Sequence, residues 1–332
     1  MKCGVLGAGS WGFCLASVLA SNGHEVVCWT TNPDLARQLN RERIHPKFPH
    51  HPCRSNMRFT TDIEETLYAA EFLVESVTAA GVRTVFENIK NFQIPSCPIV
   101  ITSKGIEQNT GLILSDVIAQ VLGESRRAQL GYLSGPSFAQ EVIRGLPTSI
   151  VCSAYDYDVM VAIGVAFSNS SLRVYPNQDV LGVALGGALK NIIALACGAA
   201  EGLQLGFSAR ASLITRGLHE MRKLAVARGC RAETLNGLSG MGDLVLTCTS
   251  SLSRNFCFGQ LVAQHLTPEE ALDKIGMVVE GAYTCTSALQ LSQALNVSMP
   301  ITEAVYQVIY KKLDIKEAVA SLMLRPVKEE HL

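Results

Sequence analysis

The sequence has few charged residues, few aromatic residues and almost no net charge. Of its 332 residues, 17% are charged and 6% are aromatic, and 28 Lys plus Arg nearly balance 29 Asp plus Glu, for a formal net charge of −1. This balance gives no electrostatic footprint for nucleic acid or for an anionic membrane surface. The apolar fraction of 48% excludes a disordered chain. A charge content below the usual ~25% predicts many helices that are buried or that face another subunit.

The sequence also lacks a cysteine framework. Its 11 cysteines are an odd number, are widely spread and include no C-x-x-C pair. In a chain of this length they are typical of small buried hydrophobic residues in a reducing compartment, so we expect a cytoplasmic protein. A single redox-active thiol is the alternative. The loop that carries His45, His50 and His51 has no second Cys/His cluster at ligand spacing, and we therefore expect no metal site.

Long uninterrupted apolar runs are scarce. Residues 180–200 come nearest to a membrane span, but Lys190 and Asn191 interrupt them. A lysine at the centre of a membrane helix costs about 2.5–3.5 kcal/mol on insertion scales, so we expect no membrane span. Met1-Lys2 and the apolar run after them resemble a short signal peptide. The glycines inside that run, however, form the motif described below, which favours a folded segment instead.

The order of the expected elements changes near residue 178. Before it, short β-rich runs alternate with helical runs, which predicts a Rossmann-like α/β domain with a parallel-rich sheet. After it, Ala, Leu and Gly recur in helical periodicity, which predicts an all-α domain. We therefore place a domain boundary near residue 178, between an α/β half over 1–178 and an all-α half over 179–332. The strands are expected at 3–6, 25–30, 72–77, 99–102, 130–133, 148–153 and 172–175.

Several short motifs predict element boundaries. Asn22-Gly23 closes a helix over 10–21, and Asn32-Pro33 begins another as N-cap and first residue. Pro136 is expected to open a helix after Gly135, and Thr267-Pro268 to begin a capped helix. Residues 237–242 are expected to form a loop.

A glycine-rich motif follows the first expected strand. Gly7, Gly9 and Gly12 form a complete G-x-G-x-x-G between a strand and a helix. The first glycine permits the tight turn, the second lets a pyrophosphate approach the backbone, and the third allows close helix–strand packing. The helix N-terminus then offers free N–H groups and a positive dipole end to phosphates. The pattern predicts a dinucleotide site.

The acidic residue that usually holds the adenosine ribose of NAD is missing from its expected place. The second strand ends in Thr30-Thr31, and the nearest acid, Asp34, lies in the next helix. No arginine stands there for a 2′-phosphate, since Arg37 and Arg41 also belong to that helix. We therefore expect NAD or NADP, without a preference.

Two segments place polar residues at the carboxyl ends of expected strands, where open α/β sheets bind ligands. Lys104 comes just past one strand, and Gly135 with Ser137 follows another. Each alone is also typical of a surface lysine or a helix cap. Their shared topological position favours a binding role.

Lys190 is the most informative charge, because it lies in an otherwise apolar helix. Gly186 and Gly187 lie one turn earlier, which predicts an open notch beside the ammonium group. Burial lowers the pKa of a lysine toward neutrality, which suits proton transfer. The alternatives are a lysine that snorkels to the helix end or pairs with a structural acid.

A third polar group, Ser253-Arg254-Asn255, precedes a helical run. Arginine with serine and asparagine at a helix start suits a phosphate or a carboxylate, although a tripeptide alone carries little information.

Taken together, the sequence resembles the bacterial-type NAD(P)-dependent sn-glycerol-3-phosphate dehydrogenase family. The matching motifs keep their order and spacing over almost the whole chain. They are Gly7-Ala-Gly-Ser-Trp-Gly12, Ser103-Lys-Gly-Ile106, Ser134-Gly-Pro-Ser-Phe-Ala139, Leu189-Lys-Asn191, Thr215-Arg-Gly-Leu218, Gly240-Met-Gly-Asp-Leu244, Thr247-Cys-Thr-Ser250, Ser253-Arg-Asn255, Val279-Glu-Gly281, Met299-Pro-Ile301 and Arg325-Pro326.

The resemblance implies a role for each matching position. Lys190 resembles the family's proton donor and acceptor. The implied contacts to the cofactor, NAD or NADP, are Gly7, Gly9, Ser10, Trp11, Gly12, Lys104, Ala139, Arg254, Val278 and Glu280. The implied contacts to the substrate, dihydroxyacetone phosphate or sn-glycerol 3-phosphate, are Lys104, Gly135, Ser137, Lys190, Asp243, Ser253, Arg254 and Asn255. The implied reaction is hydride transfer, and its product serves glycerophospholipid biosynthesis. The implied assembly is a homodimer. The resemblance also makes 1–178 a dinucleotide-binding domain and 179–332 a helical substrate and catalytic domain.

The sequence departs from the family pattern in three places. Thr30-Thr31 stand where the family often has Arg or His, Val77-Thr78-Ala79 replace a usual Val-Pro-Ser, and Phe256 replaces a frequent Arg. A β-hydroxyacid-type dehydrogenase and a non-catalytic dinucleotide-binding sensor are the alternative functions.

Overall fold

The computed structural model describes residues 1–327, 329 and 330. The described chain forms two compact units. Unit 1 contains Met1–Ser103 and Leu114–Val180, and unit 2 contains Lys104–Ile113 and Leu181–Leu332. The sequence analysis placed Lys104–Ile113 in the α/β half, whereas its contacts assign it to the helical unit. The functional division at residue 178 stays a prediction.

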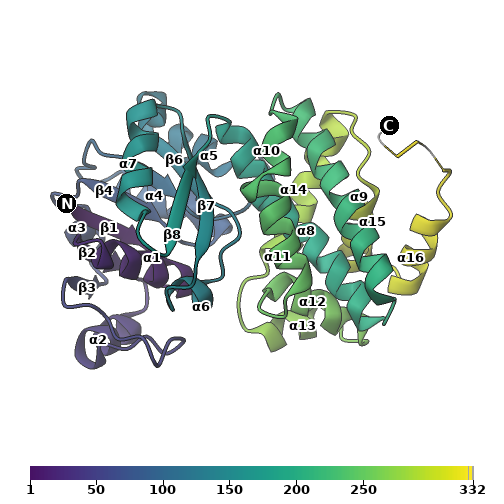
Figure 1. The fold of residues 1–332 in the computed structure, drawn as a ribbon, viewed down its shortest axis with the longest axis horizontal. Coiled ribbons are helices and arrows are strands. Elements are labelled where there is room, and N and C mark those ends of the chain that lie inside the picture. Colours follow the sequence, from purple (N-terminus) through teal and green to yellow (C-terminus); the bar gives the residue numbers. More distant parts are fainter. Residues whose placement is uncertain (328, 331–332) are drawn as a thin grey trace. The chain divides into compact units, whose positions relative to one another are not determined.

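Unit 1 is built on an eight-stranded sheet (Figure 1). Its strands are β1 (Lys2–Leu6), β2 (Glu25–Trp29), β3 (Met57–Thr60), β4 (Phe72–Glu75), β5 (Ile99–Ile101), β6 (Leu130–Ser134), β7 (Thr148–Ala154) and β8 (Leu172–Pro176). The order is β3-β2-β1-β4-β5-β6-β7-β8, and every pair is parallel except β6 with β7. The predicted Rossmann-like fold is confirmed. The chain turns from β3 back to β4 beside β1, which makes the carboxyl ends of β1 and β4 the ligand-binding crevice of such a sheet.

Helices join the strands of unit 1. They are α1 (Ser10–Ser21), α2 (Pro33–Glu42), α3 (Ile63–Leu67), η1 (Ala79–Gly81), α4 (Val82–Ile89), α5 (Leu114–Leu122), η2 (Glu124–Gln129), α6 (Ala139–Val142) and α7 (Tyr157–Phe167). Helix α1 contacts α6 and α7, whereas α4 contacts α5. Right-handed crossovers that run in opposite directions from the centre of the sheet place these two groups on opposite faces.

Unit 2 is helical. Its elements are α8 (Val180–Gly202), α9 (Gly206–Ala227), α10 (Ala232–Asn236), the π-helical turn η3 (Leu238–Gly242), α11 (Asp243–Thr249), α12 (Arg254–Ala263), α13 (Pro268–Ile275), α14 (Glu280–Ala294), α15 (Pro300–Lys311) and α16 (Ile315–Met323). The predicted all-α character of this half is confirmed.

The apolar segment that resembles a membrane span is a core helix of unit 2. Helix α8 is long and apolar enough to cross a membrane, but 89% of its most apolar window is buried inside the protein. Its backbone approaches α12 closely: a Cβ on Gly198 would lie 1.9 Å from the Phe256 carbonyl oxygen. A Cβ on Gly259 of α12 would lie 2.1 Å from the Leu195 carbonyl oxygen. The small residues of this helix therefore serve close helix packing.

The segment Lys104–Ile113 joins unit 2 through apolar contacts. Ile106 and Ile113 form an isolated bridge with each other, and both belong to the buried core of the helical unit. The Ser287 hydroxyl donates toward the carbonyl oxygens of Ile106 and Glu107 at 3.3 Å each.

The capping predictions are confirmed at most boundaries. The Asn32 side chain accepts from the N–H groups of Asp34 and Leu35, and Asn22 caps the end of α1. Thr267 forms a complete capping box with Glu270.

Three details of the predicted elements were wrong. Helix α6 begins at Ala139, so Pro136 lies in the loop that precedes it and does not open the helix. Residues 238–242 form a π-helical turn where a loop was predicted. Strand β3 was not predicted, because its four residues alternate between apolar and polar over too short a run to stand out.

The cysteines behave as small hydrophobic residues, as predicted. All 11 lie among the described residues and are free thiols, and only Cys257 is not fully buried. Burial raises the pKa of Cys152 to about 11 and that of Cys3 to about 12. Such thiols are inert because the thiolate is the reactive form.

Candidate active site

The predicted phosphate loop lies between β1 and α1 of unit 1. Gly7 has a φ of +115°, and a Cβ there would lie 2.3 Å from the Ser76 carbonyl oxygen. A Cβ on Gly12 would lie 1.9 Å from the Gly7 carbonyl oxygen. Only glycine fits at these two positions, because each backbone segment is packed directly against the next.

The middle glycine differs from its neighbours, because it borders open space. No described atom lies within 4 Å of a Cβ built on Gly9. Gly9 is also the N-cap of the 12-residue helix α1, and no described side chain caps that end. The first-turn N–H groups therefore point toward an open backbone surface, and this surface fits the pyrophosphate of a dinucleotide. Ser10 and Trp11 lie in the first turn of α1, and their contacts to the cofactor stay predictions.

The end of β2 carries no acid, as the sequence indicates. Thr30 is buried and accepts a hydrogen bond from the Asn32 N–H at 3.2 Å. Asp34 and Arg37 pair with each other on the exposed face of α2, and Arg41 pairs with Glu42. This end of the sheet therefore presents neither a carboxylate for a ribose nor a placed arginine for a 2′-phosphate.

His45 belongs to the core beside the phosphate loop. Its Nδ1 accepts from the Lys47 N–H at 3.1 Å, so Nε2 carries the proton toward the Ala8 carbonyl oxygen at 3.3 Å. The ring packs against Phe13 and Phe48. Burial lowers the pKa of His45, which favours the neutral ring.

The predicted residues after β6 also lie in unit 1. Gly135 has a φ of +125°, and the Ser137 hydroxyl donates to its carbonyl oxygen at 3.1 Å. Ala139 begins α6 and packs beside α1, where its carbonyl oxygen accepts from the Cys14 thiol at 3.6 Å. The structure thus places these three residues in one short loop and the helix start that follows it.

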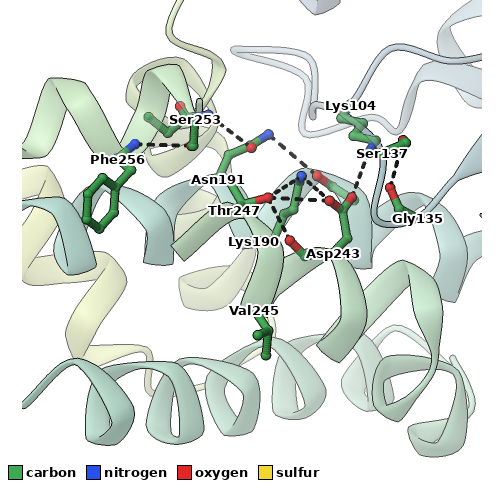
Figure 2. A network of polar contacts seen from close by, with 12 residues as sticks. Lys104, Gly135, Ser137, Lys190, Asn191, Asp243, Val245, Thr247, Ser253 and Phe256 are labelled. Carbon is green, nitrogen blue, oxygen red and sulfur yellow. Dashed lines mark hydrogen bonds and ion pairs between the residues drawn. The ribbon is translucent and has the colours of Figure 1, made fainter. Parts of the chain in front are cut away.

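In unit 2 two predicted lysines, Lys104 and Lys190, pair with the buried carboxylate of a third predicted residue, Asp243. Asp243, at the start of α11, is only 1% exposed. The Lys190 ammonium group of α8 pairs with its Oδ1, and the Lys104 Nζ lies 2.6 Å from its Oδ2. Figure 2 shows the side chains of Lys190, Asp243 and Thr247 pointing toward one another. Paired charges are the usual condition for burying a lysine and an aspartate.

Thr247 completes this cluster, and the sequence analysis assigned it no role. Lys190 donates to the Thr247 Oγ1 at 2.6 Å, and that hydroxyl lies 2.6 Å from the Asp243 carbonyl oxygen, to which it donates. Asp243 and Thr247 stand four residues apart on one helix, which places both on the same face. This four-residue spacing was the sequence signal for Thr247. It identifies Thr247 as a site residue only once Asp243 is known to face Lys190.

The cluster sets the protonation of Lys190 in opposing ways. Burial lowers the pKa of Lys190 from 10.5 to about 8, Asp243 raises it, and Lys104 lowers it. A lysine with a pKa of about 8 exchanges its proton near neutral pH, as general acid–base catalysis requires.

The predicted notch beside Lys190 was wrong at Gly186. A Cβ on Gly186 would lie 2.6 Å from the Ser239 carbonyl oxygen, so the π-helical turn η3 fills this space. The glycine allows that close approach and leaves no opening for a ligand.

The predicted tripeptide begins α12 and connects three helices. Ser253 is the N-cap, and its hydroxyl accepts from the Phe256 N–H at 3.2 Å. Asn255 is buried, donates to the Asn191 side chain at 3.0 Å and accepts from the Gly281 N–H at 2.8 Å. Asn255 therefore joins α12 to α8 and to the start of α14.

Arg254 points to the remaining predicted residues of unit 2. Its guanidinium donates to the Val278 carbonyl oxygen at 2.6 Å. Neighbouring atoms that shield it from water lower its pKa, and the Glu280 carboxylate opposes this. The structure thus brings Arg254, Val278 and Glu280 together, and their shared role stays a prediction.

The comparisons with known proteins match both halves of the chain. A family model described as the N-terminus of NAD-dependent glycerol-3-phosphate dehydrogenase matches residues 2–160, and one described as its C-terminus matches residues 179–320. The chain belongs to the NAD-dependent glycerol-3-phosphate dehydrogenase family. The resemblance predicted from the motifs is confirmed.

Individual members of this family align over their full length. The chain is 60% identical over 331 residues to the glycerol-3-phosphate dehydrogenase [NAD(P)+] of Protochlamydia amoebophila (strain UWE25), covering 100% of this chain and 99% of the relative. It is 56% identical to that of Chlamydia pneumoniae, over 99% of this chain and 98% of the relative. The crystal structure of glycerol-3-phosphate dehydrogenase from Coxiella burnetii has a TM-score of 0.93 and 34% identity, covering 98% of this chain and 99% of that one.

Proposed function

We propose that this protein is an NAD(P)-dependent glycerol-3-phosphate dehydrogenase that reduces dihydroxyacetone phosphate to sn-glycerol 3-phosphate for glycerophospholipid biosynthesis. Family membership supports the reaction, and the single observation that carries the chemistry is the buried Lys190–Asp243–Lys104 cluster. An apolar helix that buries a lysine beside one shared carboxylate is an expensive arrangement, which a proton-transfer role explains.

Lys190 is the proposed general acid and base. When bound, NADH or NADPH supplies the hydride that reduces C2 of the substrate. The C2 oxygen gains negative charge as the C–H bond forms, and the Lys190 ammonium group gives it a proton, leaving a neutral amine. In the reverse direction the amine removes the hydroxyl proton. Asp243 and Thr247 hold the Lys190 Nζ in one place through this change of charge.

Unit 1 supplies the proposed cofactor site. The open backbone at Gly9 and the N-terminus of α1 bind the pyrophosphate, and Gly7 and Gly12 keep the loop in its narrow turn. Because the end of β2 lacks both an acid and a placed arginine, we expect either cofactor to bind.

Charged and polar residues of unit 2 are the proposed substrate contacts. Lys104 and Arg254 supply positive charge for a phosphate, whereas Ser253 and Asn255 hold the start of α12. The contacts expected at Gly135, Ser137, Ala139, Val278 and Glu280 stay predictions from the resemblance.

The direct test is a steady-state assay of the purified protein with dihydroxyacetone phosphate, with NADH and NADPH compared side by side. Turnover that requires the phosphorylated substrate supports the proposal. A preference for an unphosphorylated hydroxy acid identifies a β-hydroxyacid-type dehydrogenase. Cofactor binding without turnover of either substrate class identifies a dinucleotide-binding sensor.

We further propose a cytoplasmic homodimer that associates through unit 2. A cavity of about 1030 Å³ lies between α8, α9, α12, α15 and α16 and has mostly apolar walls. Two of its lining residues, Leu205 and Met323, are 41% and 80% exposed, and Phe207, two residues after Leu205, is 80% exposed. Large exposed apolar side chains around a groove are typical of a protein interface. Light scattering of Phe207→Glu tests this: the dimer should weaken, and an unchanged mass excludes this surface.

A further inference from the structure

A second buried acid lies in unit 1, at the carboxyl end of β4. Glu75 is fully buried, and its register partners are Leu6 on β1 and Ile101 on β5. Sequence reasoning did not single it out, and none of the proposed steps uses it. A carboxyl group that is removed from water needs a reason to remain there.

The hydrogen bonds of Glu75 join the ends of two strands. Its Oε1 accepts from the Val77 N–H at 2.8 Å, and its Oε2 lies 3.3 Å from the Ser103 N–H. The Ser103 Oγ lies 2.7 Å from the Glu75 Oε1 and 2.5 Å from the Val77 carbonyl oxygen. The side chain thus ties the segment after β4 to the segment after β5.

The count of hydrogens favours a neutral Glu75. The Ser103 hydroxyl has one hydrogen but two close acceptors, Glu75 and Val77. If Glu75 is ionised, one of these short oxygen–oxygen contacts has no hydrogen between its atoms. If Glu75 is protonated, it donates to Ser103 and Ser103 donates to Val77, so every contact is satisfied. We call this arrangement the Glu75–Ser103–Val77 relay.

The relay fixes the segment against which the phosphate loop packs. Ser76 lies between Glu75 and Val77, and its N–H donates to the Leu6 carbonyl oxygen at 2.9 Å. The carbonyl oxygen of Ser76 faces Gly7. A Cβ built on Gly12 would lie 3.2 Å from the Cβ of Ser76. A shift of this segment therefore moves the wall of the glycine turn.

We propose that Glu75 is a positioning residue of the dinucleotide site, which holds the wall of the phosphate loop as a neutral acid through Ser103 and Val77. This inference rests on the proposed function, because it assumes that the loop binds a dinucleotide. Ionised Glu75 breaks the relay and also places a negative charge in the sheet beside a site for phosphates.

Because of its surroundings, the Glu75 carboxyl group changes its protonation state near neutral pH. Burial raises the pKa of Glu75 from 4.5 to about 7, and hydrogen bonds from Ser103, Val77 and Thr102 lower it. These hydrogen-bonding groups are all uncharged. The register partners Leu6 and Ile101, the loop Gly7–Gly12 and η1 are also uncharged, and the charged residue next to Ser103 in sequence is Lys104. We therefore expect NADH to bind more weakly as the pH rises through about 7.

The test is the dissociation constant of NADH, measured by fluorescence between pH 6 and pH 8.5. For the unaltered protein we expect it to rise about tenfold over this range, the size of effect expected for the loss of one hydrogen bond. Glu75→Gln removes the ionisation and should make the constant independent of pH. Ser103→Ala breaks the relay and should weaken binding about tenfold at pH 6, and Ser103→Thr, which keeps the hydroxyl, should restore it.

Glu220→Gln is the matched control. Glu220 is also buried, its pKa is also raised to about 7 by burial, and it also accepts from backbone N–H groups, but it lies in unit 2. Its replacement should leave the NADH constant within about twofold, since its hydrogen-bond partners Ile301 and Thr302 belong to unit 2. The inference is overturned if Glu75→Gln keeps the pH dependence of the unaltered protein or if Ser103→Ala binds NADH normally. If the unaltered protein binds neither NADH nor NADPH at any pH, the proposed function fails instead.

Discussion

Each unit buries a carboxyl group at its candidate site, and the two groups have opposite surroundings. Glu75 in unit 1 is surrounded by neutral donors, whereas Asp243 in unit 2 lies between two lysine ammonium groups. Burial without a counter-charge favours a neutral acid that holds backbone in place. Burial with two cations preserves the charges and creates a lysine that exchanges protons. The groups around a buried acid therefore decide whether it holds backbone in place or supports proton transfer.

The largest effect is expected where unit 1 relies on close backbone packing. In Gly12→Ala the new Cβ would lie 1.9 Å from the Gly7 carbonyl oxygen, so we expect loss of NADH binding together with a lower Tm. Gly9→Ala meets no described atom within 4 Å, and it should keep the Tm while weakening NADH binding. Calorimetry and NADH titration of both variants check this. Equal behaviour of the two would contradict an open surface at Gly9.

Asp243→Asn removes the counter-charge from unit 2 and tests the comparison directly. We expect kcat to fall about 100-fold, because the Lys190 ammonium group loses its fixed position. The pKa of Lys190 should also fall below about 8, since Asp243 raises it in the unaltered protein. The pH profile of kcat measures this change. A profile that keeps its midpoint would exclude electrostatic control of Lys190 by Asp243.

The pH profile of the unaltered protein should separate the two directions of the reaction. Reduction of the ketone requires the Lys190 ammonium form, so its rate should fall as the pH rises through about 8. Oxidation of the alcohol requires the neutral amine, so its rate should rise through the same pH. Initial rates in both directions between pH 6 and pH 10 check this. Parallel profiles would contradict the assignment of Lys190.

Glu220 sharpens the comparison, because it lies in the helical unit without an adjacent ammonium group. Its carboxyl group accepts from the N–H groups of Ile301 and Thr302 at the start of α15. Burial raises its pKa from 4.5 to about 7, and the hydrogen bonds from Ile301 and Thr302, followed by the charge of Arg325, oppose this. The stability from the neutral acid is therefore present in full below pH 4.5 and is lost as the pH rises to about 7.

The expected size of this effect is about 3 kcal/mol, the equivalent of the pKa difference between 4.5 and about 7. Glu220→Gln should remove that part of the pH dependence from the free energy of unfolding, measured in urea at pH 5 and pH 8. An unchanged pH dependence would show that surroundings alone do not set the behaviour of buried acids here.

Local patterns in the sequence predicted the features that depend on neighbouring residues. The glycine turn at Gly7–Gly12 and the caps at Asn32 and Thr267 follow from backbone geometry that a few residues determine. Lys190 stood out because its helix is otherwise apolar.

Features that depend on distant packing were not predictable in this way. Gly186 was expected beside a notch, but only the fold places Ser239 against it. The segment after β5 carries ordinary apolar residues, and nothing local shows that Ile106 and Ile113 join the helical core. Glu75 resembles a polar residue at the end of a strand until Ser103 is brought beside it. The pairing of Asp243 with Lys190 joins residues 53 positions apart.

The central claim is that unit 1 binds the dinucleotide and that Lys190 in unit 2 transfers the proton. Lys190→Ala tests this claim most directly. The measurement is kcat for reduction of dihydroxyacetone phosphate, taken together with the dissociation constant of NADH. We predict that kcat falls by about 10²–10⁴-fold, the range for loss of a general acid, while NADH binds as in the unaltered protein. Unchanged turnover in a folded Lys190→Ala protein would contradict the account.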